Sequence, residues 1–106
     1  MTAAAAKMAF SLFPFTVHIV RGHSMHPSIK EGDRVVVYNW AYAFSQPKVG
    51  DVIVFSGSDK KKYVKRIIAV AADKKSFVVE GDNKSDSKKL PPITREAIIG
   101  KVVASY

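Results

Sequence analysis

Short apolar stretches separated by turn-forming residues are the main pattern of this 106-residue chain. These stretches are rich in valine, isoleucine and phenylalanine, as expected of β-strands. After Pro14 no helical period is sustained. The pattern predicts strands over residues 16–21, 34–38, 52–55, 63–71, 77–80 and 98–104.

Turn signals lie between the predicted strands. Glycine gives access to positive φ and proline fixes φ, so clusters of these residues with aspartate or asparagine mark turns. Such clusters occupy residues 31–33, 46–51, 57–59, 81–83 and 91–92. Six short strands in so few residues favour a mostly β fold with little helix, in the form of a small curled sheet or barrel.

An aromatic stretch over residues 39–45 does not fit one element. Trp40, Tyr42 and Phe44 alternate there with small residues, and both an edge strand and a substrate-facing loop are compatible with this pattern. A chain of this length supports one core. We therefore expect a single β domain over residues 17–106, preceded by an apolar segment over residues 1–16.

The apolar N-terminal segment is short for a membrane-spanning helix. Residues 8–20 carry no acidic residue, lysine or arginine, but this run has only 13 residues and Pro14 interrupts it. A spanning helix needs about 20 apolar residues, and no small-residue cleavage site marks a signal peptide. A membrane-contact anchor and an ordinary packed segment both fit.

Lysine dominates the charge of the chain, which is formally +8 from 17 Lys and Arg against 9 Asp and Glu. Its runs, residues 60–62, 74–75 and 88–89, lie where turns are predicted. Basic surfaces attract anionic lipid or nucleic acid, so composition leaves open a non-catalytic β module with a stacking platform of aromatic residues. Without cysteine, disulfides and thiolate metal sites are excluded.

Ser24 and Lys65 are the candidate catalytic pair. A serine is a poor nucleophile unless a neighbouring base removes its proton. A free lysine has a pKa near ~10.4 and is protonated at neutral pH, so burial would have to lower the pKa of Lys65. Strand alternation places Lys65 on the face of Ile67 and Ala69. Local sequence alone also fits a turn serine and an exposed strand lysine.

Three histidines precede or flank the candidate serine: His18, His23 and His26. Histidine titrates near neutrality and is a competing base, but side chains one and two residues from Ser24 seldom reach its hydroxyl. We expect His23 and His26 to be structural or to face solvent. The histidine spacing, without an acidic cluster, does not favour a metal site, and the sequence predicts no cofactor.

Five short blocks follow one another along the chain. They are Ser24-Met25-x-Pro27, Gly32-Asp33, residues 50–55, residues 64–68 and Gly81-Asp82-Asn83. Their order resembles the type I signal peptidase family over roughly residues 17–103. The resemblance implies a membrane-associated serine endopeptidase with its catalytic domain on the extracytoplasmic face. It implies precursor proteins as substrates, cut after small residues of their signal or leader peptides, and no specific nucleic-acid partner.

The resemblance also implies roles for individual residues. Ser24 becomes the nucleophile and Lys65 the general base. The Ser24 backbone N–H contributes to the oxyanion site, and Met25 lines the site beside it. Gly22 stands where many family members carry a serine that supports the oxyanion.

A shortened loop follows Gly81-Asp82-Asn83. Ser85 is the candidate partner that orients Lys65, and Asp86 aligns with the family's Asp-Ser-Arg triplet in this loop. The nearest alternative is the self-cleaving domain of SOS-type repressors, which shares the fold and the Ser–Lys pair. No Ala-Gly or Cys-Gly dipeptide occurs upstream of Ser24, and the Gly81-Asp82-Asn83 block favours the peptidase.

Overall fold

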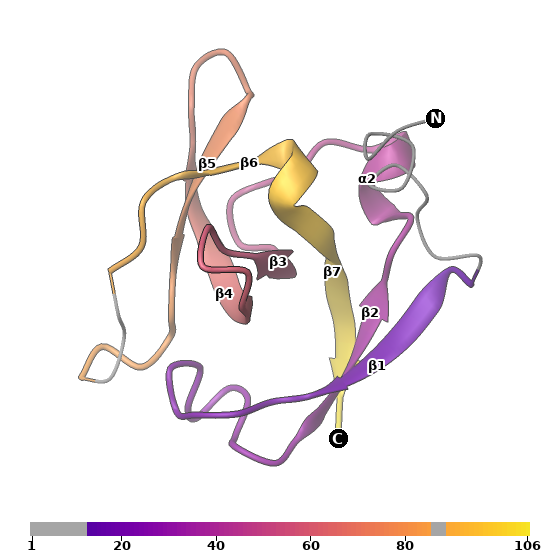
Figure 1. Cartoon of the computed structure of the whole chain (residues 1–106), viewed down its shortest axis with the longest axis vertical. Helices are drawn as coiled ribbons and strands as arrows, with labels where there is room; N and C mark the ends of the chain where they lie inside the picture. Colours follow the sequence, from indigo (N-terminus) through magenta and orange to yellow (C-terminus); the bar gives the residue numbers. More distant parts are fainter. Residues whose placement is uncertain (1–12, 86–88) are drawn as a thin grey trace.

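A single antiparallel sheet dominates the computed structural model, which describes residues 13–85 and 89–106 (Figure 1). The strands are β1 Phe15–Ile19, β2 Arg34–Tyr38, β3 Val52–Ser56, β4 Lys62–Val70, β5 Ser76–Glu80, β6 Ile93–Thr94 and β7 Ile98–Ser105. Their order in the sheet is β1-β2-β7-β3-β4-β5-β6. The sheet curls into a half-barrel, so the mostly β prediction is confirmed.

All six predicted strands are present, with ends that differ from the prediction by at most two residues. β1 ends at Ile19 instead of Arg21. Val20 still bonds across to the residues before β2, since Val20 N–H donates to Asp33 O and Gly32 N–H donates to Val20 O, and the chain bends from Gly22 onward. The seventh strand, β6, was not predicted. It has only two residues after Pro91-Pro92 and is defined by its pairing with β5, in which Ile93 lies opposite Phe77.

The aromatic stretch contains a short helix, α2 Ala41–Phe44, so the edge-strand interpretation of residues 39–45 is wrong. Arg95 explains the difference. Its guanidinium donates to Tyr42 O at 2.6 Å and to Ser45 O at 3.0 Å, which satisfies carbonyls at the end of the helical turn. Arg95 begins the 3-10 turn η1 Arg95–Ala97, about fifty residues away in sequence.

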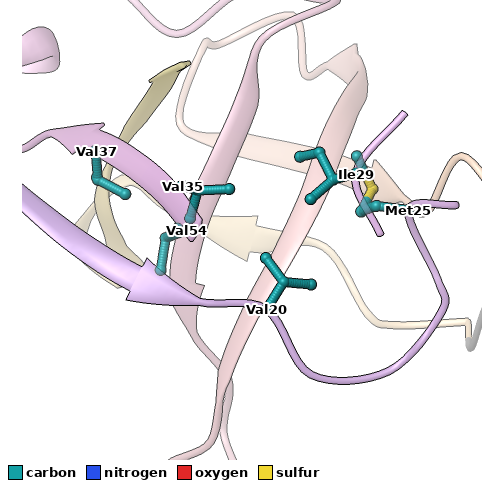
Figure 2. Packing of buried hydrophobic residues seen from close by; sticks show 6 residues of the cluster. All are labelled: Val20, Met25, Ile29, Val35, Val37 and Val54. Carbon is teal, nitrogen blue, oxygen red and sulfur yellow. The ribbon is translucent and has the colours of Figure 1, made fainter. Parts of the chain in front are cut away.

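Two apolar clusters form the core, and β3 contributes to both. Val54 belongs to the first cluster, whereas Ile53 and Phe55 belong to the second. Alternate residues of a strand point to opposite faces, so β3 is buried on both sides. Figure 2 shows the first cluster, which consists of Val20, Met25, Ile29, Val35, Val37 and Val54. The second consists of Ile53, Phe55, Ile67, Phe77, Val79 and Ile93.

The N-terminal segment is described only from Phe13 onward. Phe15 and Thr16, from the end of the predicted apolar segment, already belong to β1. The rest of that segment lies outside the described residues, so the division at residue 16 stays a prediction. Within residues 13–85 and 89–106, no helix has the length and apolar character needed to cross a membrane.

Candidate active site

Ser24 and Lys65 both line a cavity of about 290 Å³ between β1, the loop that follows it, β3 and β4. Sequence places the two residues far apart. Three strands separate β1 from β4 in the sheet, and the curl of the sheet brings the end of β1 and the following loop, which carries Ser24, to β4. The other polar or charged side chains of the lining include His18, Arg21, Lys62 and Tyr63.

Lys65 is buried, with only 3% of its surface exposed. It lies opposite Ile53 in the β3–β4 register, and Ile67 follows it on the same face of β4. Both isoleucines are fully buried members of the second cluster. The sequence left open which face of β4 is buried, and the structure buries the face that carries Lys65. Burial disfavours the charged form of a lysine.

The loop that carries Ser24 is anchored by apolar side chains. Met25 and Ile29 are 1% and 5% exposed, and both insert into the first cluster (Figure 2). Within the loop, His26 N–H donates to His23 O and Ile29 N–H donates to Met25 O. The buried Met25 therefore holds the chain in place next to Ser24, which is itself half-buried at the cavity.

The Gly81-Asp82-Asn83 turn binds the serine loop. Asn83 N–H donates to Ser24 O at 2.7 Å, and the Asn83 side-chain amide donates to His23 O at 2.9 Å. The Ser28 hydroxyl also bonds to the Asp82 carboxylate. Three contacts thus fix the loop on both sides of Ser24.

Arg66 connects this turn to β4. Its Nε and NH2 groups donate to the two oxygens of Asp82 at 2.9 and 2.8 Å, and its NH1 group donates to Gly50 O. The hydrogen bonds from Arg66 hold the pKa of Asp82 below its ordinary value, with a smaller contribution from Ser28. The residue next to Lys65 is therefore tied to the turn that positions Ser24.

His18 is a cavity residue that the sequence analysis did not assign to the serine site. It projects from β1 into the lining of the cavity. Burial lowers its pKa, and the positive charge of Lys62 lowers it further, so both effects favour the neutral imidazole. Strand alternation could have predicted this position of His18. His18 shares a face of the strand with Val20, and Val20 lies shortly before Ser24 in sequence.

Hydrogen bonds define the orientation of the His18 ring. The Thr16 hydroxyl donates to the Asn39 side-chain oxygen at 3.1 Å and lies 3.0 Å from His18 Nε2. Since the only hydroxyl proton of Thr16 is used toward Asn39, His18 Nε2 is the donor to Thr16. The lone pair of the neutral ring is therefore on Nδ1.

His23 and His26 are exposed and do not belong to the cavity lining. The solvent-facing prediction for both is confirmed. His23 Nε2 lies 3.2 Å from Glu31 Oε1, and the same carboxylate accepts a hydrogen bond from Gly22 N–H. Gly22 has φ of +84°, a conformation that favours glycine, although an added Cβ would meet no heavy atom within 4 Å.

The remaining candidates lie on the loop after β5. Ser85 is exposed, and its hydroxyl donates to the Asn83 side-chain oxygen at 2.9 Å. Its role as the partner of Lys65 stays a prediction. Asp86 lies outside the described residues.

The aromatic residues of α2 lie at another cavity. Trp40, Tyr42 and Phe44 line a space of about 440 Å³ together with Arg95 and Ile98. Neither Ser24 nor Lys65 belongs to that lining. The aromatic stretch therefore does not form a wall of the serine cavity.

A curled β domain with a loop serine and a buried strand lysine at one cavity defines the structural class of this chain. The model of the family described as "Signal peptidase, peptidase S26" matches residues 1–77. The chain therefore belongs to the signal peptidase S26 family.

Curated relatives agree with this assignment. The chain is 28% identical over 99 residues to signal peptidase I of Bacillus caldolyticus, a match that covers 90% of this chain and 54% of that protein. It is 37% identical over 65 residues to signal peptidase IB of Staphylococcus aureus, covering 61% of this chain and 34% of the relative. The chain thus spans about half the length of the first relative and about a third of the second.

Proposed function

We propose that this chain is a serine endopeptidase of the signal peptidase type, with Ser24 as nucleophile and Lys65 as general base. One observation carries the proposal: a half-buried serine and a lysine that is only 3% exposed line the same cavity. A neutral amine is the form that can accept a proton, and burial favours that form.

Acylation begins when neutral Lys65 accepts the proton of the Ser24 hydroxyl while Ser24 Oγ attacks the carbonyl carbon of the scissile peptide bond. The carbonyl oxygen becomes an oxyanion in the tetrahedral intermediate. The intermediate collapses as the C–N bond breaks, and Lys65 returns the proton to the leaving amine. The amino-terminal part of the substrate remains as an ester on Ser24.

Deacylation uses the same base. Lys65 accepts a proton from water as the water oxygen attacks the ester carbon, and the proton then passes to Ser24 Oγ as the ester bond breaks. The Ser24 backbone N–H is a donor for the oxyanion in both steps. Gly22 offers no side-chain hydroxyl, so backbone donors supply a larger share of this stabilisation here than in relatives with serine at that position.

Family membership supports precursor proteins as substrates and a membrane as the site of action. We infer cleavage after small residues in a signal or leader peptide, with the catalytic domain on the extracytoplasmic face. Vesicle flotation of the full chain against a version lacking residues 1–12 tests membrane association. Association that survives this deletion would assign membrane contact to the β domain itself.

The dyad is tested with an internally quenched peptide that carries alanine at the cleavage position. Ser24→Ala and Lys65→Met should each reduce kcat/KM by about 10²- to 10⁴-fold, because removal of a nucleophile or general base typically costs two to four orders of magnitude. Methionine resembles the lysine stem in length and needs no buried charge, so Lys65→Met should remain folded.

Lys61→Met is the matched control, since Lys61 is exposed, lies just before β4 and does not line the cavity. It should cleave the peptide as the wild type does. Normal turnover in a folded Lys65→Met variant would refute the dyad. A single cut in the chain itself upstream of Ser24, with no cleavage of added peptides, would instead favour the self-cleaving repressor-like activity.

A further inference from the structure

The serine cavity has a cationic rim. Arg21 follows β1 and Lys62 begins β4, and both exposed side chains belong to the lining that includes Ser24 and Lys65. No carboxylate of the described residues lines this cavity. A ligand in the cavity therefore meets positive charge without a compensating acidic group.

The charges of Arg21 and Lys62 are not neutralised by the part of the chain that the structure describes. The ion pairs among those residues join His23 to Glu31, Arg66 to Asp82, Lys84 to Glu80 and Lys101 to Asp51, and neither rim residue takes part. The charge of Lys62 reaches into the cavity, since it contributes to the low pKa of His18.

We propose that Arg21 and Lys62 select peptide substrates that carry an acidic residue close to the cleavage position. This inference rests on the proposed function, because it assumes that a peptide lies extended at Ser24. A carboxylate beside the scissile bond would pair with the two cations, whereas a lysine or arginine there would be repelled. Unlike charges at a few ångströms attract strongly where solvent is partly excluded, and the preference should weaken with added salt.

A peptide fits these cations better than a lipid headgroup does. Arg21 and Lys62 share one concave lining with the candidate catalytic residues, so a peptide at Ser24 lies close to both cations. The lysines that face outward on the same turn, Lys60 and Lys61, do not line the cavity. They provide matched charges outside the cavity for the experiment.

The test measures peptide binding without turnover. A set of fluorescent peptides has alanine at the cleavage position. Each peptide carries a single Glu, Gln or Lys at one of the three positions on either side of the cleavage site. Their dissociation constants for the Ser24→Ala chain are measured by fluorescence anisotropy at low salt. At one position or more, the Glu peptide should bind about tenfold more tightly than the Lys peptide, a difference of about 1.4 kcal/mol. The added substitutions Arg21→Gln and Lys62→Gln should reduce this ratio to about two or less, and Lys61→Gln should leave it unchanged.

Each result distinguishes the charge preference from the catalytic proposal. Absence of peptide binding, an equal affinity for Glu and Lys peptides, or a ratio unchanged by the double substitution would overturn the charge preference. Cleavage of Glu and Lys peptides at equal rates by the Ser24-containing chain would support the endopeptidase activity and overturn the charge preference. Tighter binding of the Glu peptide, with no cleavage by the Ser24-containing chain, would support the charge preference and refute the proposed endopeptidase activity. If the double substitution abolishes binding to phosphatidylglycerol vesicles and leaves the peptide ratio unchanged, the rim contacts lipid and the proposal fails.

Discussion

Asp82→Asn is expected to loosen the serine loop, because Asp82 is the group through which Arg66 reaches that loop. The carboxylate accepts two hydrogen bonds from Arg66, at 2.9 and 2.8 Å, and one from the Ser28 hydroxyl. An asparagine of the same size removes the negative charge and one of the two acceptor oxygens. Arg66 on β4 then loses the carboxylate that accepts both of its hydrogen bonds.

The stability lost in Asp82→Asn should lie between the contribution of a surface ion pair and that of a buried one. Hydrogen bonds to charged groups contribute about 1.5–3 kcal/mol each, whereas exposed ion pairs contribute about 0–1 kcal/mol. The Asp82 side chain is 18% exposed and the Arg66 side chain 36% exposed, so solvent screens the arginine end. We expect the substitution to lower the free energy of unfolding by about 1–2 kcal/mol at pH 7.

The effect should depend on pH in one direction. Arg66 holds the pKa of Asp82 below the ordinary value of 3.8. A carboxyl whose pKa is lowered by folding contributes its full stabilisation above its unfolded pKa and loses it as the pH falls through the folded pKa. The difference between wild type and Asp82→Asn should therefore be constant from about pH 5 to 7 and shrink below about pH 4.

Urea unfolding followed by circular dichroism at several pH values measures this difference. Glu80→Gln is the control, because it also removes one negative charge near the end of β5 and breaks only the exposed pair with Lys84. It should cost less than about 1 kcal/mol. Equal losses for the two variants at pH 7, or an Asp82→Asn difference that is undiminished at pH 3, would refute the role assigned to Asp82.

Substitutions at three further positions test contacts around the sheet, each by urea unfolding. Tyr42→Phe removes the 2.7 Å hydrogen bond to Asp51 and should lower the free energy of unfolding by about 1 kcal/mol at pH 7. Because folding raises the Tyr42 pKa above 10.0, the difference between wild type and variant should shrink as the pH rises above 10.0. Gly100→Ala would place a methyl group 2.6 Å from Val37 Cγ1 and should cost about 1–3 kcal/mol; no loss would mean that the backbone moves freely there. Met25→Ala should cost about 2–5 kcal/mol, whereas Met25→Leu should cost less than about 1.5 kcal/mol; similar losses would contradict the anchoring role of its buried side chain.

Short apolar runs and the turn residues between them were sufficient to predict most of the sheet. Residues 34–38 contain three consecutive valines, and β2 has the predicted ends. Contacts between distant residues were not accessible in the same way. The helical turn of α2 depends on Arg95, and β6 exists because it pairs with β5. Neither contact leaves a periodic signal in the stretch that it shapes.

The candidate site was predictable to a different degree for each residue. Ser24 and Lys65 were chosen from block order, and their shared cavity agrees with the choice. The cavity position of His18 and the tie between Asp82 and Arg66 required the folded arrangement of β1, β4 and the turn after β5. A linear pattern reports which side chains share a face of a strand, but not which face is buried or which loop lies against it.

β4 connects the two halves of the site through its alternation. Lys65 points to the buried face opposite Ile53, and Arg66, one residue later, points to the other face and binds Asp82. A shift of the β3–β4 register by one residue would exchange these faces. It would bury the arginine and detach the lysine from the cavity at the same time. The pairing of β4 with β3 and β5 therefore sets both the burial of the candidate base and the position of the loop that carries the candidate nucleophile.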